Sequence, residues 1–595
     1  MVTSLTESRT SFLSAIASES GEDQQLIERL FEHVATEDLA ARDAAYLGGA
    51  AHSLANLSRA RDHATEVRVF TPSSATHGWT SPRTVVQVCT DDSPFLVDSI
   101  TEAISALGYR VHLIVHPIMP AGIASGRANG RDESWMHIEI SRLADEESHE
   151  RVRSTLTRVL SDVAKAVADW RPMREKCLAI VEEISASRPP TVPAQDAERA
   201  IEFLTWLTHD QFTFLGYREY TLTEDDGELA LAPVPGTGLG ILGEETSRIS
   251  RLRPEAQATA REPRLLTITK ANSRATVHRS AYLDYIGIRT FDDEGNVTGE
   301  RRLLGLFTSS TYASSVTQVP IISAKAEEII RRSGHSPDSH SGKDLHQVLE
   351  TYPREELFQD SVENLTQIAE EVVYLEERRR SKMFVRTDEF GRFISVLVYI
   401  PRDRYSTAVR LKIEALLREA YDPETIDFTT NISESPLAQV HLVLRMPRGE
   451  DLPKVDVAAL QNDLNLAVRT WDDQLVHLLR EAHGETVASE ILADYAGAFS
   501  AAYQDTISPA AAVEDLDLLR SLTRPQDVRV RVDHNGTWRF RVASYVEFPL
   551  TQVMPILTAF GVKVVDERPF PVTLTGERSR HISDFGLELG DGEHA

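Results

Sequence analysis

Hydrophobic residues follow two spacings along the chain, and each change of spacing marks a predicted element. Alternation with period two predicts strands, whereas apolar residues three and four positions apart predict helices. Between positions 84 and 170 the patterns read strand, helix, strand, strand, helix, at Val85–Cys89, Leu96–Leu107, Val111–Val115, Ser134–Ile140 and Glu147–Trp170. This order is most of a ferredoxin-like βαββαβ unit, whose last strand is not visible in the pattern.

Two further stretches show the same mixture of strand and helix patterns. In the second, MFVRT and RFISVLVYI flank the turn DEFG, and a helix pattern covers Ser406–Ala420 before the strand VHLVLRM. In the third, VRVRV and TWRFRV alternate strictly around His534-Asn535-Gly536, which is typical of a hairpin turn. His581–Leu589 is a plausible third strand there, and no second helix follows, so this unit is expected to be incomplete.

The third stretch also repeats part of the first. Phe95–Met119 and Phe548–Val572 have equal length, and each contains a helix pattern, a glycine and a strand pattern. Gly108 and Gly561 occupy the same position in this alignment, where a helix C-cap belongs. The repeat predicts related folds near the two ends of the chain.

Proline-rich linkers and changes of pattern predict seven regions. They are an N-terminal helical region (1–80), a first ferredoxin-like unit (81–187), a strand-rich region (197–322), a helical motif (323–381), a second unit (382–482), a helical connector (483–525) and the incomplete third unit (526–595). The chain is therefore expected to be a multidomain α+β protein.

The turn Asp91-Asp92-Ser93 joins the first strand to the first helix, and three interpretations are open. Asp92 or Ser93 is suited to cap the helix, and Pro94 suits its first turn. Alternatively, the helix start binds the carboxylate of a small effector while Asp91 pairs with its ammonium group. Catalysis by the two aspartates ranks last, because no nucleophile or base is placed beside them.

Ile114 is a candidate for a contact between domains or subunits. A ferredoxin-like sheet carries helices on one face, and Ile114 lies in the row of His112 and His116, opposite the row of Val111. An apolar residue in that row argues against a purely solvated face. Another sheet, a helix or a second subunit is expected to cover it.

Composition narrows the class of protein. The chain has 595 residues and a formal net charge of −28, which disfavours binding to nucleic acid. Its two cysteines, Cys89 and Cys177, lie in apolar segments and are expected to be buried thiols in a reducing compartment. The sequence shows no basic, apolar leader and no apolar run that would span a bilayer, so we expect a cytoplasmic protein without a membrane partner.

Familiar cofactor motifs are absent or lie in the wrong context. Gly238–Gly243 fits GxGxxG, but no buried strand precedes it and no strand with a terminal acid follows. His335, His340 and His346 fit no compact metal-ligand spacing. We therefore expect no cofactor, metal or catalytic residue in this chain.

Several long motifs closely resemble the N-terminal half of the large bacterial NAD-specific glutamate dehydrogenases. They are FLGYREY from Phe214, LETYPREELFQ from Leu349, MFVRTDEFGRFISVLVYIPRDRYST from Met383, TDDSPFLVDSI from Thr90 and DERPF from Asp566. The resemblance runs from about Ser81 to the end of the chain. It implies that the ferredoxin-like units are ACT-type domains, which often bind amino acids, and that the strand-rich region is PAS-like.

The resemblance also implies a function. Members of this family catalyse NAD-dependent oxidation of L-glutamate to 2-oxoglutarate and ammonia, with a catalytic domain later in the chain that assembles as a homotetramer. This chain would then be the regulatory and oligomerisation segment of a longer protein, inactive alone, with NAD bound elsewhere. The alternative is a free-standing ACT-type amino-acid sensor, which a stop codon after Ala595 would favour.

The motif VYIPRDRY joins a predicted strand to a predicted helix. Pro401 ends a strand, and Arg402, Asp403, Arg404 and Tyr405 then start a helix. Asp403 is a candidate cap, and the arginines are suited to bind carboxylates of a neighbouring domain. We expect an architectural role, with contact between domains as the alternative.

Overall fold

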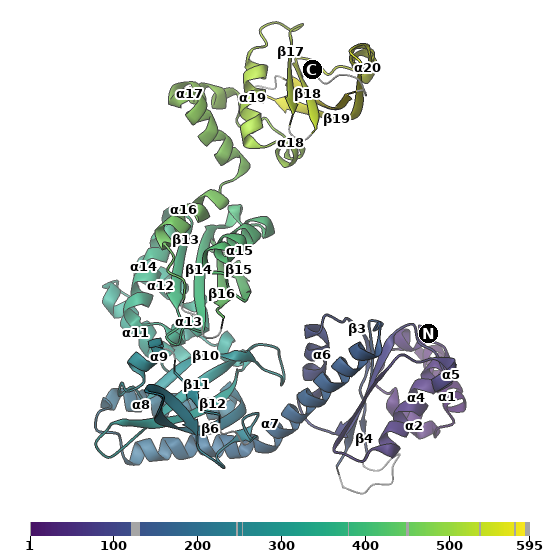
Figure 1. The fold of residues 1–595 in the computed structure, drawn as a ribbon, viewed down its shortest axis with the longest axis vertical. Coiled ribbons are helices and arrows are strands. Elements are labelled where there is room, and N and C mark those ends of the chain that lie inside the picture. Colours follow the sequence, from purple (N-terminus) through teal and green to yellow (C-terminus); the bar gives the residue numbers. More distant parts are fainter. Residues whose placement is uncertain are drawn as a thin grey trace. The chain divides into compact units, whose positions relative to one another are not determined.

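The computed structural model describes residues 2–120, 131–244, 248–252, 254–378, 380–447, 452–534, 537–575 and 579–589. These residues fall into two compact units, and each is described by itself. The first contains residues 1–374, 386–395 and 445–451, and the second contains 375–385, 396–444 and 452–595. Helices and antiparallel sheets occur in both, which confirms the α+β expectation (Figure 1).

The first sheet places an unexpected strand at its edge. Its strands are β1 (Thr65–Phe70), β2 (Thr84–Asp91), β3 (Val111–Val115), β4 (Ile118–Met119) and β5 (Glu133–Ile140), in the order β1-β2-β5-β3 with β4 beside β5. Helix α6 (Leu96–Ala106) joins β2 to β3, and α7 (Glu146–Ala186) follows β5. The outer strand therefore precedes the unit, where residues 1–80 were predicted to be helical, and no strand follows its second helix.

The same strand order recurs twice. The second sheet has the order β13-β14-β16-β15, from β13 (Lys382–Thr387), β14 (Phe393–Pro401), β15 (Thr425–Asn431) and β16 (Leu437–Arg445), with α15 (Thr407–Tyr421) between β14 and β15. The third has the order β17-β18-β20-β19, from β17 (Val528–His534), β18 (Trp538–Ser544), β19 (Val562–Thr573) and β20 (Ser579–Leu589), with α20 (Leu550–Ala559). The third sheet thus has the same order of four strands, and the strand expected at His581–Leu589 lies within β20.

The internal repeat is confirmed in detail. Helix α6 aligns with α20, and strand β3 aligns with the start of β19. Gly108 and Gly561 both have positive φ, at 83° and 75°, just after these helices. That left-handed conformation is costly for a side-chain-bearing residue, which explains why both positions are glycine. Residues 535 and 536 of the predicted hairpin turn lie outside the described residues, whereas β17 and β18 pair antiparallel as expected.

Helices cover both faces of the first sheet. Helices α1 (Val2–Ser20), α2 (Gln24–Leu30), α3 (Thr36–Ala40) and α4 (Ala44–Ala60) lie on one side, where Leu113, Val115 and Trp135 share their core. Helices α6 and α7 lie on the other side, where Ile114 is partly buried. Ile114 was expected on the face away from the unit's own helices, but it lies on the face that α6 and α7 cover, and α1 to α4 cover the opposite face.

Burial explains the patterns of these strands. Every residue of β5 is buried, because the strand lies centrally between two helical layers. The edge strand β1 is mostly half-buried, and its Val67 and Val69 pack on the core that α7 covers. Cys89 and Cys177 are buried free thiols, as predicted.

The strand-rich region forms a seven-stranded antiparallel sheet. Its order is β10-β11-β12-β6-β7-β9, with β8 beside β6, from β6 (Phe212–Asp225), β7 (Glu228–Pro233), β8 (Leu239–Gly240), β9 (Ser250–Arg251), β10 (Leu266–Arg274), β11 (Tyr282–Phe291) and β12 (Val297–Phe307). Helix α7 packs on β6 and β8, so this long helix joins the first sheet and the seven-stranded sheet (Figure 1).

The remaining elements connect these sheets. In the first unit they are α5 (Ser74–His77), α8 (Ala194–Trp206), η1 (Leu207–Gln211), α9 (Pro254–Thr259), α10 (Ser309–Ala313), η2 (Val316–Gln318), α11 (Ile322–Ser333), α12 (His340–Thr351) and α13 (Arg354–Gln359), followed by α14 (Val362–Arg378), whose end lies in the second. The second unit adds η3 (Arg402–Arg404), α16 (Val457–Ala467), α17 (Trp471–Tyr495), α18 (Ala501–Thr506) and α19 (Pro509–Arg520).

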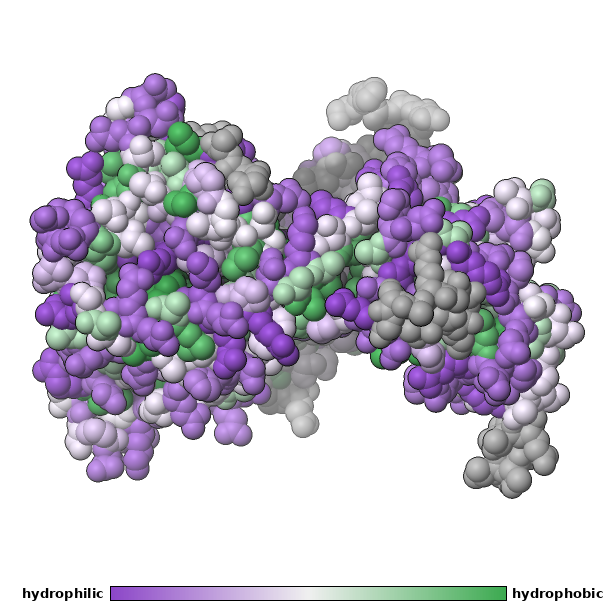
Figure 2. Space-filling view, turned by 90° about the horizontal axis from the view of Figure 1, so that it is seen from below, coloured by the Kyte–Doolittle hydropathy of each residue, from purple (hydrophilic) through white to green (hydrophobic). Residues whose placement is uncertain are grey.

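The face of the molecule in Figure 2 is mostly polar. Figure 2 shows hydrophilic residues over most of the visible face, with small apolar patches between them, as a chain with this much charge predicts. Among the described residues, no helix is both long and apolar enough to cross a membrane.

Candidate functional site

The turn after β2 does not cap α6 with a polar side chain. Asp91 ends β2, and Phe95 is the residue that precedes the first turn of α6, with φ of 72° and no side-chain cap. The expectation that Asp92 or Ser93 caps the helix is therefore wrong. A phenylalanine in the left-handed region is strained, and the structure holds it there as Ser99 donates hydrogen bonds from its backbone N–H and its Oγ to the Phe95 carbonyl.

Asp91 is part of a buried ion-pair network. Its Oδ1 lies 2.5 Å from Nη2 of Arg61, and Nη1 of the same arginine lies 3.1 Å from Oε1 of Glu133. Glu133 also accepts hydrogen bonds from Ser58 Oγ and Trp135 Nε1. Arg61 and Glu133 are almost completely buried. The negative charge of Asp91 is therefore already matched by Arg61, and Asp91 holds β2 against the end of α4.

Asp92 has a separate set of partners. Its Oδ1 accepts a hydrogen bond of 2.6 Å from Ser134 Oγ, and its backbone N–H donates to the Asp132 carbonyl. Ser134 Oγ also lies 3.1 Å from Nε2 of His116. Burial lowers the pKa of His116, and the charge of Asp92 opposes this effect only partly. Asp92 thus fixes the turn to β5, whereas Asp91 fixes it to the end of α4.

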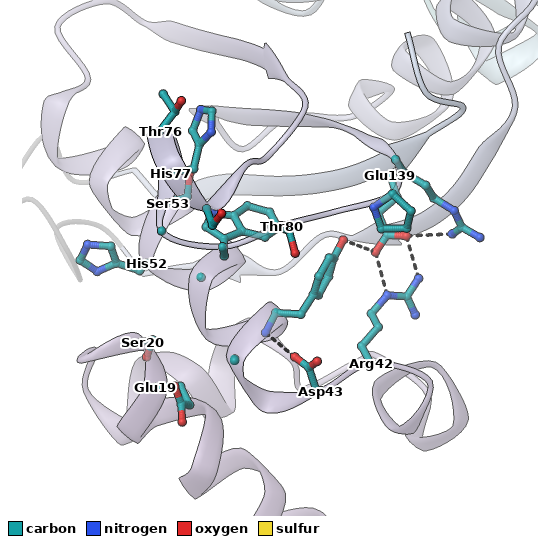
Figure 3. A pocket seen from close by; sticks show the side chains of 18 of the residues that line it. Glu19, Ser20, Arg42, Asp43, His52, Ser53, Thr76, His77, Thr80 and Glu139 are labelled. Carbon is teal, nitrogen blue, oxygen red and sulfur yellow. Dashed lines mark hydrogen bonds and ion pairs between the residues drawn. The ribbon is translucent and has the colours of Figure 1, made fainter.

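A wide polar pocket lies between the N-terminal helices and the first sheet (Figure 3). Its volume is about 1120 Å³, and side chains from α1, α4, the segment around α5 and strand β5 line it. Glu139 is the buried acid of this pocket. Its carboxylate accepts hydrogen bonds from Arg42 (2.7 and 2.9 Å), Arg83 (2.8 Å) and the Tyr46 hydroxyl (2.7 Å).

The partners of Glu139 decide its charge. Burial raises the pKa of this carboxyl, but the hydrogen bonds from Arg42 and Tyr46 outweigh burial and bring the pKa to about 2. Burial also raises the pKa of Tyr46, so its hydroxyl stays protonated and donates. Since Arg42 and Glu139 are 97 positions apart, no local motif could have predicted this cluster.

Glu139 should make the stability of the folded protein depend on pH. A folded-state pKa of about 2, below the ordinary 4.5, stabilises the protein above pH 4.5, and this stabilisation is lost as the pH falls towards 2. In urea unfolding between pH 7 and pH 3, Glu139→Gln should therefore be less stable than the wild type at pH 7, and the difference should shrink at acid pH. A difference that is independent of pH would contradict this role.

The motif after β14 makes its contacts within the second unit. Arg402 donates from its N–H to Pro436 and from Nη1 to the Ser433 carbonyl, and Arg404 pairs with Asp473 at 3.1 Å. Tyr405 Oη lies 3.2 Å from Thr430 Oγ1. Ser406, and not Asp403, caps α15, since its side chain accepts from the Val409 N–H. Asp403 is exposed.

Two serines provide a matched test of the helix caps. Ser406→Ala removes an observed cap and should cost about 1 kcal/mol of stability. Ser93→Ala removes no cap and should change stability by less than about 0.5 kcal/mol. Thermal unfolding of the two variants checks this difference, and an equal loss in both would restore Ser93 as a cap.

Comparison with known proteins gives matches to five domain families of one enzyme. They are the glutamate dehydrogenase ACT1 domain (residues 26–156), helical motif 1 (319–378), ACT2 domain (382–472), helical motif 2 (478–522) and ACT3 domain (518–595). Each ACT match contains all the strands of one of the three sheets that share the strand order described above. Together the matches cover about two thirds of the chain.

Three curated relatives, each named NAD-specific glutamate dehydrogenase, match most of this chain. The protein from Halomonas elongata is 37% identical over 93% of the chain, that from Pseudomonas aeruginosa 34% over 95%, and that from Mycobacterium tuberculosis 31% over 82%. The chain spans only 36%, 36% and 31% of the lengths of these relatives. By its domains and its relatives, the chain belongs to the family of the large NAD-specific glutamate dehydrogenases.

Proposed function

We propose that this chain is the regulatory and oligomerisation segment of a large NAD-dependent glutamate dehydrogenase. The whole enzyme would convert L-glutamate, NAD and water to 2-oxoglutarate, ammonia and NADH. The observation that carries the proposal is that all five matched families are ACT domains or helical motifs of that enzyme. Catalysis then belongs to a part of the enzyme outside these domains.

The residues present do not fit NAD. In a dinucleotide site, a glycine-rich turn leads into a helix whose N-terminus holds the pyrophosphate. Here Gly238–Gly243 contains the short strand β8, which pairs with β6, and a turn follows it. At Gly240 an added Cβ would lie 2.1 Å from the Leu215 carbonyl oxygen, so these glycines serve close packing against β6. We assign the cofactor to the remainder of the enzyme.

The alternative function is a free-standing ACT-type amino-acid sensor, and polypeptide length distinguishes the two. An antibody raised against this chain should detect, in extracts of the source cells, a polypeptide much longer than 595 residues, as the relatives suggest. Detection of a polypeptide of this length alone, in extracts prepared with protease inhibitors, would favour the sensor.

We assign an amino-acid effector, which the ACT domains imply, to the turn Asp91-Asp92-Ser93. Because Asp91 is matched by Arg61, Asp92 is the better partner for a ligand ammonium group. Asp92→Asn keeps an acceptor for Ser134 and removes the charge, so the melting temperature should change little while the amino-acid response weakens. An unchanged response would remove the turn as an effector site.

Exposed apolar residues of the third sheet support a role in assembly. Val528, Val530 and Val532 on the edge strand β17 are 40%, 54% and 54% exposed, and Phe560 after α20 is 78% exposed. In the first unit, α7 covers the corresponding edge strand β1. Open apolar edges of this kind are typical of interaction surfaces.

Val530→Asp tests this surface. Because Val530 is already exposed, the variant should keep its melting temperature while self-association, measured by light scattering, decreases. Val457→Asp, at an exposed apolar position of α16, is the matched control and should have no effect. Equal self-association of wild type and both variants would remove β17 from the proposed assembly surface.

A further inference from the structure

A second cavity lies on one face of the seven-stranded sheet, within the first unit. Its volume is about 470 Å³, enough for a small organic molecule. Apolar side chains from several strands form much of its wall, among them Leu222, Leu231, Val297 and Leu304. Four arginines also line it, and they differ in whether a carboxylate of the protein pairs with them.

Three of these arginines have a carboxylate partner. Arg251 pairs with Asp225 at 2.7 Å, Arg302 with Glu300 at 3.1 Å and Arg392 with Asp388 at 2.9 Å. Their charges are therefore satisfied by the protein itself. The fourth arginine, Arg289 on β11, is not.

Arg289 is a buried cation that forms no ion pair with any residue that the structure describes. It is 9% exposed, its Nη1 donates to the Glu262 carbonyl, and no described residue forms an ion pair with it. Its cross-strand neighbour Glu300 instead accepts from the Tyr285 hydroxyl and from Arg302. The nearby Arg264 pairs with Glu389. Burial lowers the pKa of Arg289 and the charge of Arg264 lowers it further, while the charges of Glu389, Glu300 and Glu262 offset this only in part.

The backbone keeps space open between these groups. Gly287 lies on the same face of β11, and a Cβ there would lie 2.8 Å from Oε2 of Glu300 and 3.0 Å from the Tyr285 ring. A side chain at this position would displace both. A buried guanidinium that lacks a counter-ion is costly, so its retention beside an open cavity points to an anionic ligand.

We propose that Arg289 binds the carboxylate of a small monocarboxylic acid, whose apolar body lies against the aliphatic wall of this cavity. One guanidinium matches one carboxylate in a bidentate pair, whereas a phosphate dianion would need further donors. An α-ammonium group would need a free carboxylate, and Glu300 is engaged with Arg302 and Tyr285. The ligand is therefore a monocarboxylic acid without an ammonium group, and not an amino acid; a branched 2-oxo acid serves as the probe.

Calorimetric titration of the purified chain tests the proposal and does not depend on its enzymatic role. The probe is 4-methyl-2-oxopentanoate, with L-leucine and inorganic phosphate as comparisons. The oxo acid should bind, and Arg289→Gln should weaken this binding about 10- to 100-fold, as expected for a lost charge-assisted pair. The matched control is Arg301→Gln. Arg301 lies on the neighbouring strand β12 and pairs with Glu183, so its replacement should leave binding unchanged.

Thermal unfolding separates binding from a structural role. Without ligand, Arg289→Gln should melt at the same temperature as the wild type or higher, because it removes an unmatched buried charge. Added 4-methyl-2-oxopentanoate should raise the melting temperature of the wild type and of Arg301→Gln only. The proposal is overturned if the oxo acid does not bind, if L-leucine or phosphate binds as tightly, or if Arg289→Gln lowers the melting temperature strongly.

Discussion

Arg61→Ala is expected to destabilise the N-terminal domain by about 3–5 kcal/mol, as loss of one partner from a buried ion pair usually does. Arg61 is 5% exposed and lies between Asp91 and Glu133. Its removal leaves two carboxylates close together with no cation between them. The first unfolding transition in calorimetry should therefore move to a markedly lower temperature.

A double variant shows whether charge or packing causes the loss. Arg61→Ala combined with Asp91→Asn removes one of the two uncompensated carboxylates, so it should be more stable than Arg61→Ala alone. Asp91→Asn by itself should also lower the melting temperature, because Arg61 loses a partner. If Asp91→Asn made Arg61→Ala still less stable, the account of this network would be wrong.

Asp515→Ala should have a comparable effect in the second unit. Asp515 is 1% exposed on α19 and accepts hydrogen bonds from Arg541 Nη1 (3.0 Å to each oxygen) and from the Tyr503 hydroxyl (2.6 Å). Without it, Arg541 is buried beside fewer carboxylates and α19 loses its polar contact with β18. We expect a loss of about 3–5 kcal/mol in the transition of that unit.

Glu514→Gln is the control for this prediction. Glu514 precedes Asp515 on α19 and pairs with Arg531 at 2.9 Å, but its side chain is 62% exposed. Solvent screening makes such a pair worth little, so the change should be below about 1 kcal/mol. Similar losses in the two variants would show that burial does not set the strength of these pairs.

Local patterns predicted the central strands and the helices beside them. Strand β2 contains an apolar run, β5 mixes apolar residues with polar ones, and both are buried between the helical layers, while α6 shows regular apolar spacing. The edge strand β1 was missed because its valines alternate with Glu66 and Arg68, a pattern too short to separate from the helical region before it. A strand that other elements bury only partly carries a weak signal.

The sites were less predictable because they depend on contacts distant in sequence. Nothing near Asp91 indicates that Arg61, 30 positions earlier, matches its charge. The sequence also does not show that Phe95 adopts positive φ, which moves the start of α6 past the polar residues. Arg289 resembles many strand arginines in the sequence, and only the structure shows that its neighbour Glu300 is engaged elsewhere.

One assay tests the regulatory assignment most directly. L-glutamate and NAD are supplied to the purified 595-residue chain and, in parallel, to the whole polypeptide that its gene encodes, and NADH formation is followed with and without added amino acids. Thermal unfolding first confirms that the isolated chain is folded. We expect turnover, and its response to amino acids, from the whole polypeptide and no NADH from the chain alone. NADH formation by the isolated chain, free of contaminating enzyme, would contradict the assignment.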